Sequence, residues 1–233
     1  MIPSWQKWLF ETLYKNRYLY RFASTVPFAG QWRTWQRLAL SRLHGYNVLE
    51  LGCGLGDLLA DMIEAGYNCR AVEQSKEMVD AARSTLVERC QGEPSWIIQG
   101  QSQHLPFTDA SFDNVVSTFP SEYICDPKTI AEVERILNPG GRLIVLVGAN
   151  LLPVNPIQSF MLLIQMFIYG PGVFFKPGRQ RYRKFKVSAG ITIELVFNTE
   201  LGKHIPLEQY GLRRRCERVY NHQWEVYIVT GEK

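Results

Sequence analysis

The feature that most constrains the fold is the stretch of residues 48–57, in which a short apolar run ends in an acidic residue and turns through three glycines at alternate positions, Gly52, Gly54 and Gly56. Apolar residues at helical spacing follow it: Leu58, Leu59, Met62 and Ile63. This order predicts a buried strand, a tight loop and the N-terminus of a helix. Such a loop binds a ligand through backbone N–H groups and the positive end of the helix dipole, and glycine permits the close approach.

The glycine spacing, G-x-G-x-G, differs from two common nucleotide-binding loops. The dinucleotide loop requires G-x-G-x-x-G, whereas position 57 is Asp, and no G-x-x-x-x-G-K-[ST] phosphate loop is present. We therefore expect a ligand without a pyrophosphate. Glu73 ends the next expected strand, 68–73, and a carboxylate there is placed to accept hydrogen bonds from both hydroxyls of a ribose.

Strand and helix patterns alternate through the middle of the chain. We expect strands at 46–51, 68–73, 95–99, 112–118 and 142–149, and helices at 56–65, 75–90 and 127–137. Alternation of this kind predicts an α/β fold with a doubly wound parallel sheet. Ligands of such sheets bind beyond the carboxyl ends of the strands, where the strand order reverses.

Segments 100–107, 111–116 and 137–143 add three motifs to the glycine loop and Glu73. In this order and spacing the chain resembles class I S-adenosyl-L-methionine (SAM) dependent methyltransferases, near the ubiquinone/menaquinone and small-molecule branch. The resemblance covers residues 46–149 closely and 198–231 loosely. It implies SAM as cofactor and a Rossmann-like sheet of seven strands in the order 3-2-1-4-5-7-6, with the last strand antiparallel. A helix from Asn198 to about 209 and a hairpin of strands 212–219 and 223–230 complete this expectation.

The resemblance also implies which residues bind the cofactor: Glu50, Gly52, Cys53, Gly54, Gly56, Glu73, Gln74, Met78, Gln101, Ser102 and Thr118. Glu50 is expected to hold the methionine ammonium group and Glu73 the ribose hydroxyls, while Gln74 and Met78 border the adenine. The family usually has Asp at the position of Gln101. The Gln101 side chain can still accept from the adenine amino group, but as an uncharged partner.

Residues 117–123 follow the fourth strand, where the methyl group is expected to point. They lack the [DN]-P-P-[YF] element of amino-directed DNA methyltransferases, which disfavours methylation of a nucleobase amino group. RNA methylation stays open as an alternative, because the positive charge fits it, although no recognised RNA-binding module accompanies that charge. Tyr123 and Glu122 are candidate catalytic groups that could take a proton, and Phe119 is a candidate lining residue. The alternative is an aromatic loop packed on the next helix. Methyl transfer requires proximity, alignment and exclusion of water, and a strong base is not always needed.

Charge is distributed unevenly along the chain. Residues 45–150 carry seven basic and fifteen acidic side chains, whereas residues 151–233 carry twelve basic and six acidic ones, and residues 1–44 are also basic. Basic flanks suit an anionic partner or form a solvated face that balances the acidic core. The five cysteines are scattered, which disfavours a disulfide framework and a metal site. No secretory signal pattern is present, so we expect a cytoplasmic protein.

Both flanks allow two interpretations. Residues 4–22 predict an amphipathic helix with aromatic and basic residues, and a second helix is expected at 31–44. The first helix either covers the cofactor pocket or lies at a membrane interface. Residues 157–169 are almost wholly apolar but too short to span a bilayer, and residues 176–186 are strongly basic. This pair predicts a lid over the substrate, a segment that adsorbs to anionic lipid, or both.

We therefore expect one methyltransferase domain with four parts: a helical cover (1–44), a SAM-binding core (45–149), an apolar insertion (150–197) and a closing helix and hairpin (198–233). The first hypothesis is that the protein is a peripheral membrane protein that transfers a methyl group to a hydrophobic or lipid-like small molecule. The second is a soluble small-molecule methyltransferase. The third is a SAM-binding regulatory or assembly protein without turnover. The sequence does not indicate an oligomeric state.

Overall fold

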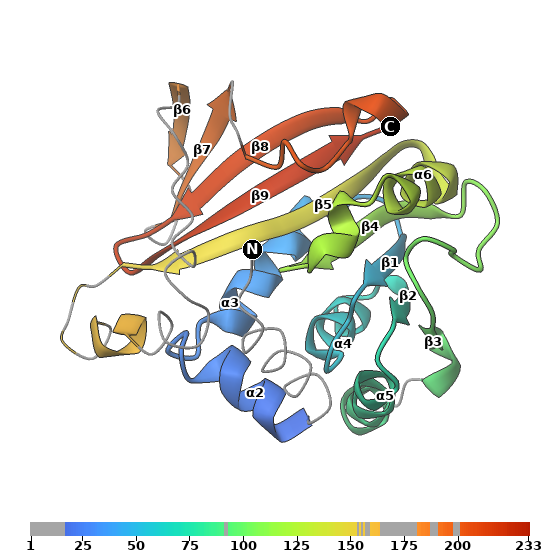
Figure 1. Cartoon of the computed structure of the whole chain (residues 1–233), viewed down its shortest axis with the longest axis horizontal. Coiled ribbons are helices and arrows are strands. Elements are labelled where there is room, and N and C mark those ends of the chain that lie inside the picture. Colours follow the sequence, from blue (N-terminus) through green and yellow to red (C-terminus); the bar gives the residue numbers. More distant parts are fainter. Residues whose placement is uncertain are drawn as a thin grey trace.

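The structure is a computed structural model that describes residues 17–90, 93–152, 154, 156, 159–163, 181–186, 191–197 and 201–233. Within this part of the chain, nine strands form one sheet in the order β3-β2-β1-β4-β5-β9-β8-β7-β6 (Figure 1). Their bounds are β1 Asn47–Leu51, β2 Asn68–Glu73, β3 Ile97–Gln99, β4 Phe112–Thr118, β5 Leu137–Leu151, β6 Arg181–Lys186, β7 Thr192–Phe197, β8 Arg213–Tyr220 and β9 Trp224–Glu232.

The first five strands are parallel, and β9 runs antiparallel to β5 and to β8. The predicted order 3-2-1-4-5-7-6 and the antiparallel last strand are therefore confirmed for seven strands. The expected count of seven is corrected to nine among the residues that the structure describes, because β7 pairs with β8 and β6 pairs with β7, both antiparallel. Both added strands come from the insertion expected at 150–197.

The hairpin of β6 and β7 was not predicted, and the reason is physical. The hydrogen-bonding groups of β8 that face away from β9 need partners, and the alternating apolar residues of β7 supply a strand that fits them. The insertion was interpreted by its overall apolar and basic composition, not by this alternation. Residues 157–158 and 164–180, which include the second half of the expected apolar segment and the start of the basic run, lie outside the described residues, as do residues 1–16 with most of the expected N-terminal helix.

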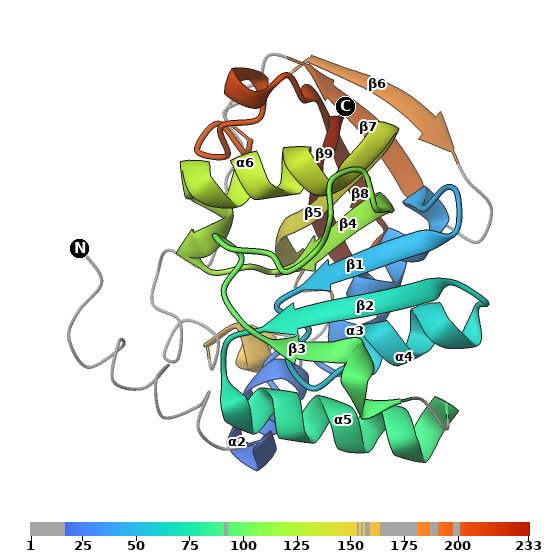
Figure 2. The same ribbon diagram turned by 90° about the vertical axis from the view of Figure 1, so that its right-hand side faces the viewer.

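Helices cover both faces of the sheet, as Figure 2 shows with α6 on one side and α4 and α5 on the other. The α-helices are α2 Arg17–Thr25, α3 Trp32–Gln36, α4 Asp57–Glu64, α5 Lys76–Cys90 and α6 Pro127–Ile136. The 3₁₀ helices are η1 Arg37–Arg42, η2 Pro94–Trp96, η3 Glu122–Cys125 and η5 Glu208–Tyr210. One core lies between the sheet and α3–α5, and a second lies under α6. The crossovers place the carboxyl ends of β1 to β5 at one edge of the sheet.

Two expected helices differ from the structure. The helix expected at 31–44 is α-helical only to Gln36 and continues as 3₁₀ helix η1. The Leu38 carbonyl there accepts hydrogen bonds from the Ser41 hydroxyl at 3.1 Å and from Arg42 Nη1 at 2.6 Å, so side chains compete for a backbone acceptor. The helix expected to reach 209 is reduced, within residues 201–210, to turns and η5, because Pro206 lacks an N–H and disfavours a helical residue before it.

Asp61 of α4 fastens the N-terminal segment to the rest of the fold. Its carboxylate accepts hydrogen bonds from Arg33 Nη2 at 2.7 Å, from Arg37 Nε at 2.8 Å and from Arg89 Nη2 at 2.6 Å. The residue is 6% exposed. Burial works against ionisation, but hydrogen bonds from Arg37, Arg89 and Arg33 outweigh it and hold the pKa of the Asp61 carboxyl well below its usual range. α3 and η1 are therefore tied to the helix that follows the glycine loop.

The first prediction is that Asp61→Asn lowers the free energy of unfolding at neutral pH by about 1–3 kcal/mol, the cost of leaving charged donors without their acceptor. Because the pKa of Asp61 is lowered in the folded protein, its contribution is present above about pH 4 and is lost as the pH falls through the folded-state pKa. Urea unfolding should therefore show a difference between wild type and variant that shrinks in acid. Asp80→Asn, which removes an exposed pair with Lys76, is the matched control and should change little. Equal effects of the two variants would contradict the prediction.

Candidate functional site

The candidate site lies at the carboxyl ends of β1 and β4, which are neighbours although β2 follows β1 in the chain. The strand order reverses between them, and doubly wound sheets bind ligands at this place. β1 leads into the glycine loop, β2 ends at Glu73, and β4 ends at Thr118. The fold therefore brings the separate motifs of the sequence to one edge of the sheet.

The glycine loop has the left-handed backbone that its sequence predicts. Gly52, Gly54 and Gly56 have φ angles of 71°, 54° and 76°. A Cβ atom at Gly52 would lie 2.6 Å from the Tyr123 hydroxyl oxygen, so the φ angle favours glycine and any larger residue would have to displace that hydroxyl. Gly56 is the N-cap of α4, and its N–H donates to the Cys53 carbonyl at 2.9 Å. Cys53 itself is buried.

Glu50, at the carboxyl half of β1, is fully buried, and neither carboxylate oxygen has a hydrogen-bond partner among the described residues. Desolvation, followed by the negative charge of Glu73, raises the pKa of Glu50 well above its usual value. A buried carboxylate without a partner is unfavourable in the free protein. The group is therefore suited to a ligand that brings a positive charge, as the ammonium of a methionine moiety would.

Glu73 joins two loops of the site. Its Oε2 accepts from the Gly54 N–H at 3.1 Å and its Oε1 accepts from the Ser75 N–H at 2.9 Å. Each carboxylate oxygen has a second lone pair, so these bonds leave acceptor capacity for the two hydroxyls of a ribose. Gln74 beside it is exposed, whereas Met78 is fully buried against Leu55 of the glycine loop.

The expected adenine side is arranged around the loop after β3. Gln101 is exposed, and its backbone carbonyl accepts from the His104 N–H at 3.1 Å. The Ser102 and Thr129 hydroxyl oxygens are 3.0 Å apart, which ties this loop to α6. The Ser102 hydroxyl is thus engaged within the protein, and the expected role of Ser102 in binding the cofactor stays a prediction.

The end of β4 meets α3, an element that the sequence interpretation did not assign to the site. Gln36 Nε2 donates to the Thr118 hydroxyl oxygen at 3.1 Å. Phe119 has a φ angle of 51°, and its ring centroid lies 4.4 Å from that of Trp32 and 6.3 Å from that of Trp35. The sequence predicted a helix at residues 31–44, but no sequence signal linked this helix to β4.

The two candidate catalytic residues occupy different environments. The Tyr123 hydroxyl lies 2.7 Å from the Ser117 hydroxyl oxygen and donates to the Leu51 carbonyl at 3.0 Å, so it connects the ends of β1 and β4. Glu122 is exposed at the start of η3. Through these contacts Tyr123 holds the end of β1, and with it the glycine loop, in place. A role in proton transfer for either residue stays a prediction.

Part of this chain is similar in sequence to known proteins. Residues 49–145 match the protein family described as a methyltransferase domain. The demethylmenaquinone methyltransferase of Symbiobacterium thermophilum is 30% identical over 145 residues, which are 59% of this chain and 57% of that protein. The ubiquinone/menaquinone biosynthesis C-methyltransferase of Hahella chejuensis is 30% identical over 134 residues, 54% of this chain and 53% of that one. The chain thus spans little more than half the length of these curated relatives.

Two solved structures are similar to this one over nearly the whole length of the chain. Protein PH0226 of Pyrococcus horikoshii has a TM-score of 0.55 at 17% identity, with 94% of this chain and 99% of that chain covered. A SAM-dependent methyltransferase of Thermotoga maritima has a TM-score of 0.53 at 20% identity, with 97% and 98% covered. At these identities the likeness shows the fold alone, and it agrees with the predicted Rossmann-like sheet.

The second prediction concerns Glu50→Gln, which keeps the shape of the side chain and removes its charge. SAM affinity should fall roughly ten- to a hundredfold, because a charged hydrogen bond is lost. Without ligand, the variant should gain stability relative to wild type as the pH rises above about 4.3. The sign follows from the raised pKa: the folded wild type binds more protons than the unfolded chain, so its stability falls as the pH rises through the folded-state pKa.

Calorimetry of SAM binding and urea unfolding across pH test both parts. Glu122→Gln is the matched control, because Glu122 is exposed on η3 and the same change there should alter neither quantity. Unchanged SAM affinity in Glu50→Gln would contradict the assignment of Glu50 to the cofactor.

Proposed function

We propose, on the premise that residues 49–145 form a methyltransferase domain of the class I SAM-dependent family, that the chain transfers a methyl group from SAM to a hydrophobic small molecule. The observation that carries this proposal is Glu50, a fully buried carboxylate without a partner in the described structure, beside the glycine loop and Glu73. These residues fit a ligand with an ammonium group and a ribose.

The proposed roles of the residues follow from their chemistry. Bound SAM supplies a methyl group already activated on a sulfonium, so the protein need not create a strong electrophile. Glu50 binds the ammonium group, and Glu73 accepts hydrogen bonds from the ribose hydroxyls. The glycine loop lets its backbone approach the ligand closely. Trp32 and Phe119, stacked at the end of β4, exclude water from the acceptor side.

The acceptor is proposed to be a hydrophobic, quinone-like molecule. The names of the relatives from Symbiobacterium thermophilum and Hahella chejuensis refer to demethylmenaquinone and to ubiquinone or menaquinone biosynthesis. Aromatic side chains from two segments of this chain lie at the expected acceptor side. Both observations support a ring-shaped acceptor over a small polar one.

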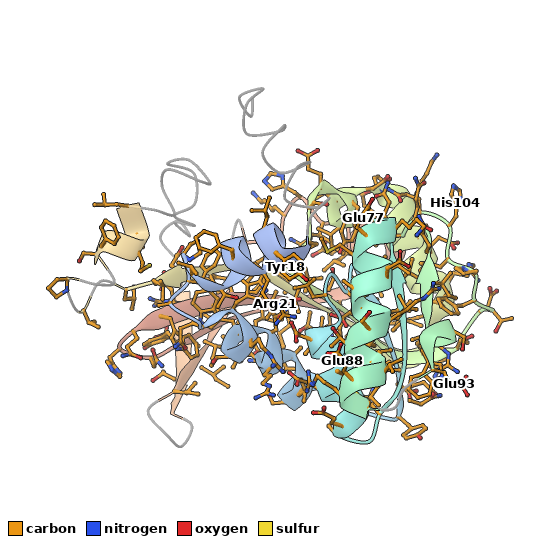
Figure 3. All side chains as sticks on the ribbon, turned by 90° about the horizontal axis from the view of Figure 1, so that it is seen from below. Tyr18, Arg21, Glu77, Glu88, Glu93 and His104 are labelled. Atoms are coloured by element: carbon orange, nitrogen blue, oxygen red, sulfur yellow. The ribbon has the colours of Figure 1, made fainter. Side chains whose placement is uncertain are left out.

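We further propose that the chain acts as a peripheral protein at an anionic membrane surface. Phe22 on α2 is 56% exposed, and Phe160 and Leu163 of the helical segment 159–163 are 59% and 63% exposed. In Figure 1 α2 lies at the bottom of the molecule and this segment at its lower left, and Figure 3 shows Tyr18 and Arg21 on α2. Exposed apolar groups beside basic ones suit a lipid surface. Within the described residues, no helix combines the length and the apolar character that crossing a bilayer requires.

The third prediction tests the activity. The protein, methyl-labelled SAM and a total cell extract are incubated, and the products are partitioned between organic and aqueous phases. Label in the organic phase is expected, because the proposed acceptor is hydrophobic. Glu73→Ala should weaken SAM binding by roughly 1–3 kcal/mol and reduce the label in parallel.

Other outcomes of this experiment would favour the alternative functions. Label in the aqueous phase only would favour a soluble small-molecule methyltransferase. SAM binding without transfer, after addition of a synthetic demethylmenaquinol and lipid, would favour a SAM-binding regulatory or assembly protein. Absence of SAM binding would overturn the proposed function.

The fourth prediction tests the membrane surface. At low salt the protein should sediment with phosphatidylglycerol vesicles and not with phosphatidylcholine vesicles, since basic residues add on the order of 1 kcal/mol each near an anionic surface. The double change Phe160→Ser and Leu163→Ser should reduce sedimentation. Val87→Ser is the matched control, because Val87 is also exposed, at 52%, but lies on α5. Failure of the wild-type protein to bind anionic vesicles would refute membrane association and leave the methyl-transfer proposal standing.

A further inference from the structure

α3 brings one polar and one aromatic side chain to the end of β4. Gln36 donates to the Thr118 hydroxyl, and one turn earlier Trp32 stacks on Phe119 with an interplanar angle of 39°. Phe28, just before α3, adds a third ring at 4.9 Å from Trp32. Thr118 and Phe119 are consecutive, so the hydrogen bond and the aromatic stack lie side by side.

The backbone of Phe119 indicates more than ordinary core packing. A bulky residue rarely adopts a φ angle of 51°, because the left-handed region is sterically unfavourable for a residue with a Cβ atom. Such conformations persist where neighbouring contacts enforce them, and they gather at binding sites. Here the rings of Trp32 and Trp35 pack against the Phe119 ring, yet Trp32 and Phe119 both remain only half-buried. The stack therefore keeps a surface that a ligand can reach.

The Gln36 amide retains hydrogen-bonding capacity after its contact with Thr118. That contact uses one N–H of the amide, so the side-chain carbonyl and a second N–H remain, and the Thr118 hydroxyl can still donate. Gln36 is half-buried. The pair thus offers both an acceptor and a donor directly beside an aromatic stack.

The order of the strands places this pair at the acceptor end of the crevice. Glu73 ends β2, Glu50 lies on the adjacent β1, and β4 follows on the other side, with Val116 as the register partner of Glu50. A ligand whose ribose meets Glu73 and whose ammonium meets Glu50 runs from β2 towards β1. The side at β4 is left for the molecule that receives the methyl group.

We propose that Trp32 and Phe119 bind the ring of the acceptor and that Gln36, oriented by Thr118, recognises an oxygen substituent on this ring. The substrate class is then a hydroxylated aromatic molecule, a phenol or a quinol. Gln36 becomes a specificity-determining residue contributed by the N-terminal segment. The inference rests on the proposed function, because it assumes that the crevice binds SAM.

The experiment compares two probes that differ by one hydrogen-bond donor, 2-naphthol and 2-methoxynaphthalene. Their binding to the full chain is followed by the anisotropy of probe fluorescence, with S-adenosylhomocysteine at saturation. The wild type should bind 2-naphthol about 2- to 10-fold more tightly, as one net hydrogen bond predicts. Gln36→Met should abolish this preference without weakening 2-methoxynaphthalene. Trp32→Leu should weaken both probes by a similar factor, about 2- to 10-fold for an aromatic contact.

Two further variants keep the test decisive. Thr34→Met is the matched control, because Thr34 is exposed on the same helix and should affect neither probe. Trp32→Phe retains a ring, so it should preserve binding of both probes even if Trp32→Leu fails to fold. A naphthol preference that survives Gln36→Met overturns the role of Gln36, and unchanged binding in Trp32→Leu overturns the aromatic stack.

The cofactor is measured separately, by calorimetry with S-adenosylhomocysteine. If the protein does not bind it, the proposed function fails. If it binds S-adenosylhomocysteine but shows no preference between the probes, the assignment of a hydroxylated ring fails and the methyltransferase proposal is unaffected.

Discussion

The buried carboxylate of Glu50 is the constraint on which the arrangement of this fold depends. A charge removed from water without a partner is unfavourable by several kcal/mol unless it binds a proton or a cation. The strained backbone of Phe119 adds a second local cost at the neighbouring strand. Two apolar cores, one on each face of the sheet, and the charged hydrogen bonds of Asp61 offset these costs away from the crevice. In the free protein, these unfavourable contributions to the free energy of folding thus lie at the place where a ligand would bind.

The N-terminal segment is part of this site and not only a cover. α3 contacts the glycine-loop helix through Asp61 and the end of β4 through Thr118 and Phe119, so one short helix touches both sides of the crevice. A boundary placed at residue 45 on sequence grounds separates elements that the structure joins. Because α3 is only five residues long, these contacts, and not its own helical stability, hold it in position.

Local patterns were sufficient for the parts of the fold that carry their own signals. Strand β2 and strand β4 begin and end where the apolar runs predicted, and the glycine loop has the left-handed angles that its residues indicated. The hairpin β6–β7 was missed because pairing with β8 is decided by the partner strand and not by its own composition. Contacts such as Gln36 with Thr118 join residues 82 positions apart and leave no periodic trace in the sequence. The alternation of strands and helices thus followed from local patterns and the order of seven strands from the family resemblance, whereas the residues that complete the acceptor side required the structure.

The nine-stranded sheet has two edges, and both are unsuitable for templating the growth of a further sheet. β3 is only three residues long, and β6 carries the sequence Arg181-Tyr182-Arg183-Lys184-Phe185-Lys186. Short edge strands and edges rich in Lys and Arg are two devices by which proteins prevent strand-to-strand aggregation. Within the described residues, the added hairpin therefore moves the edge of the sheet from β8 to β6, a strand in which four of the six residues are Lys or Arg, a composition typical of edges that resist pairing with another strand.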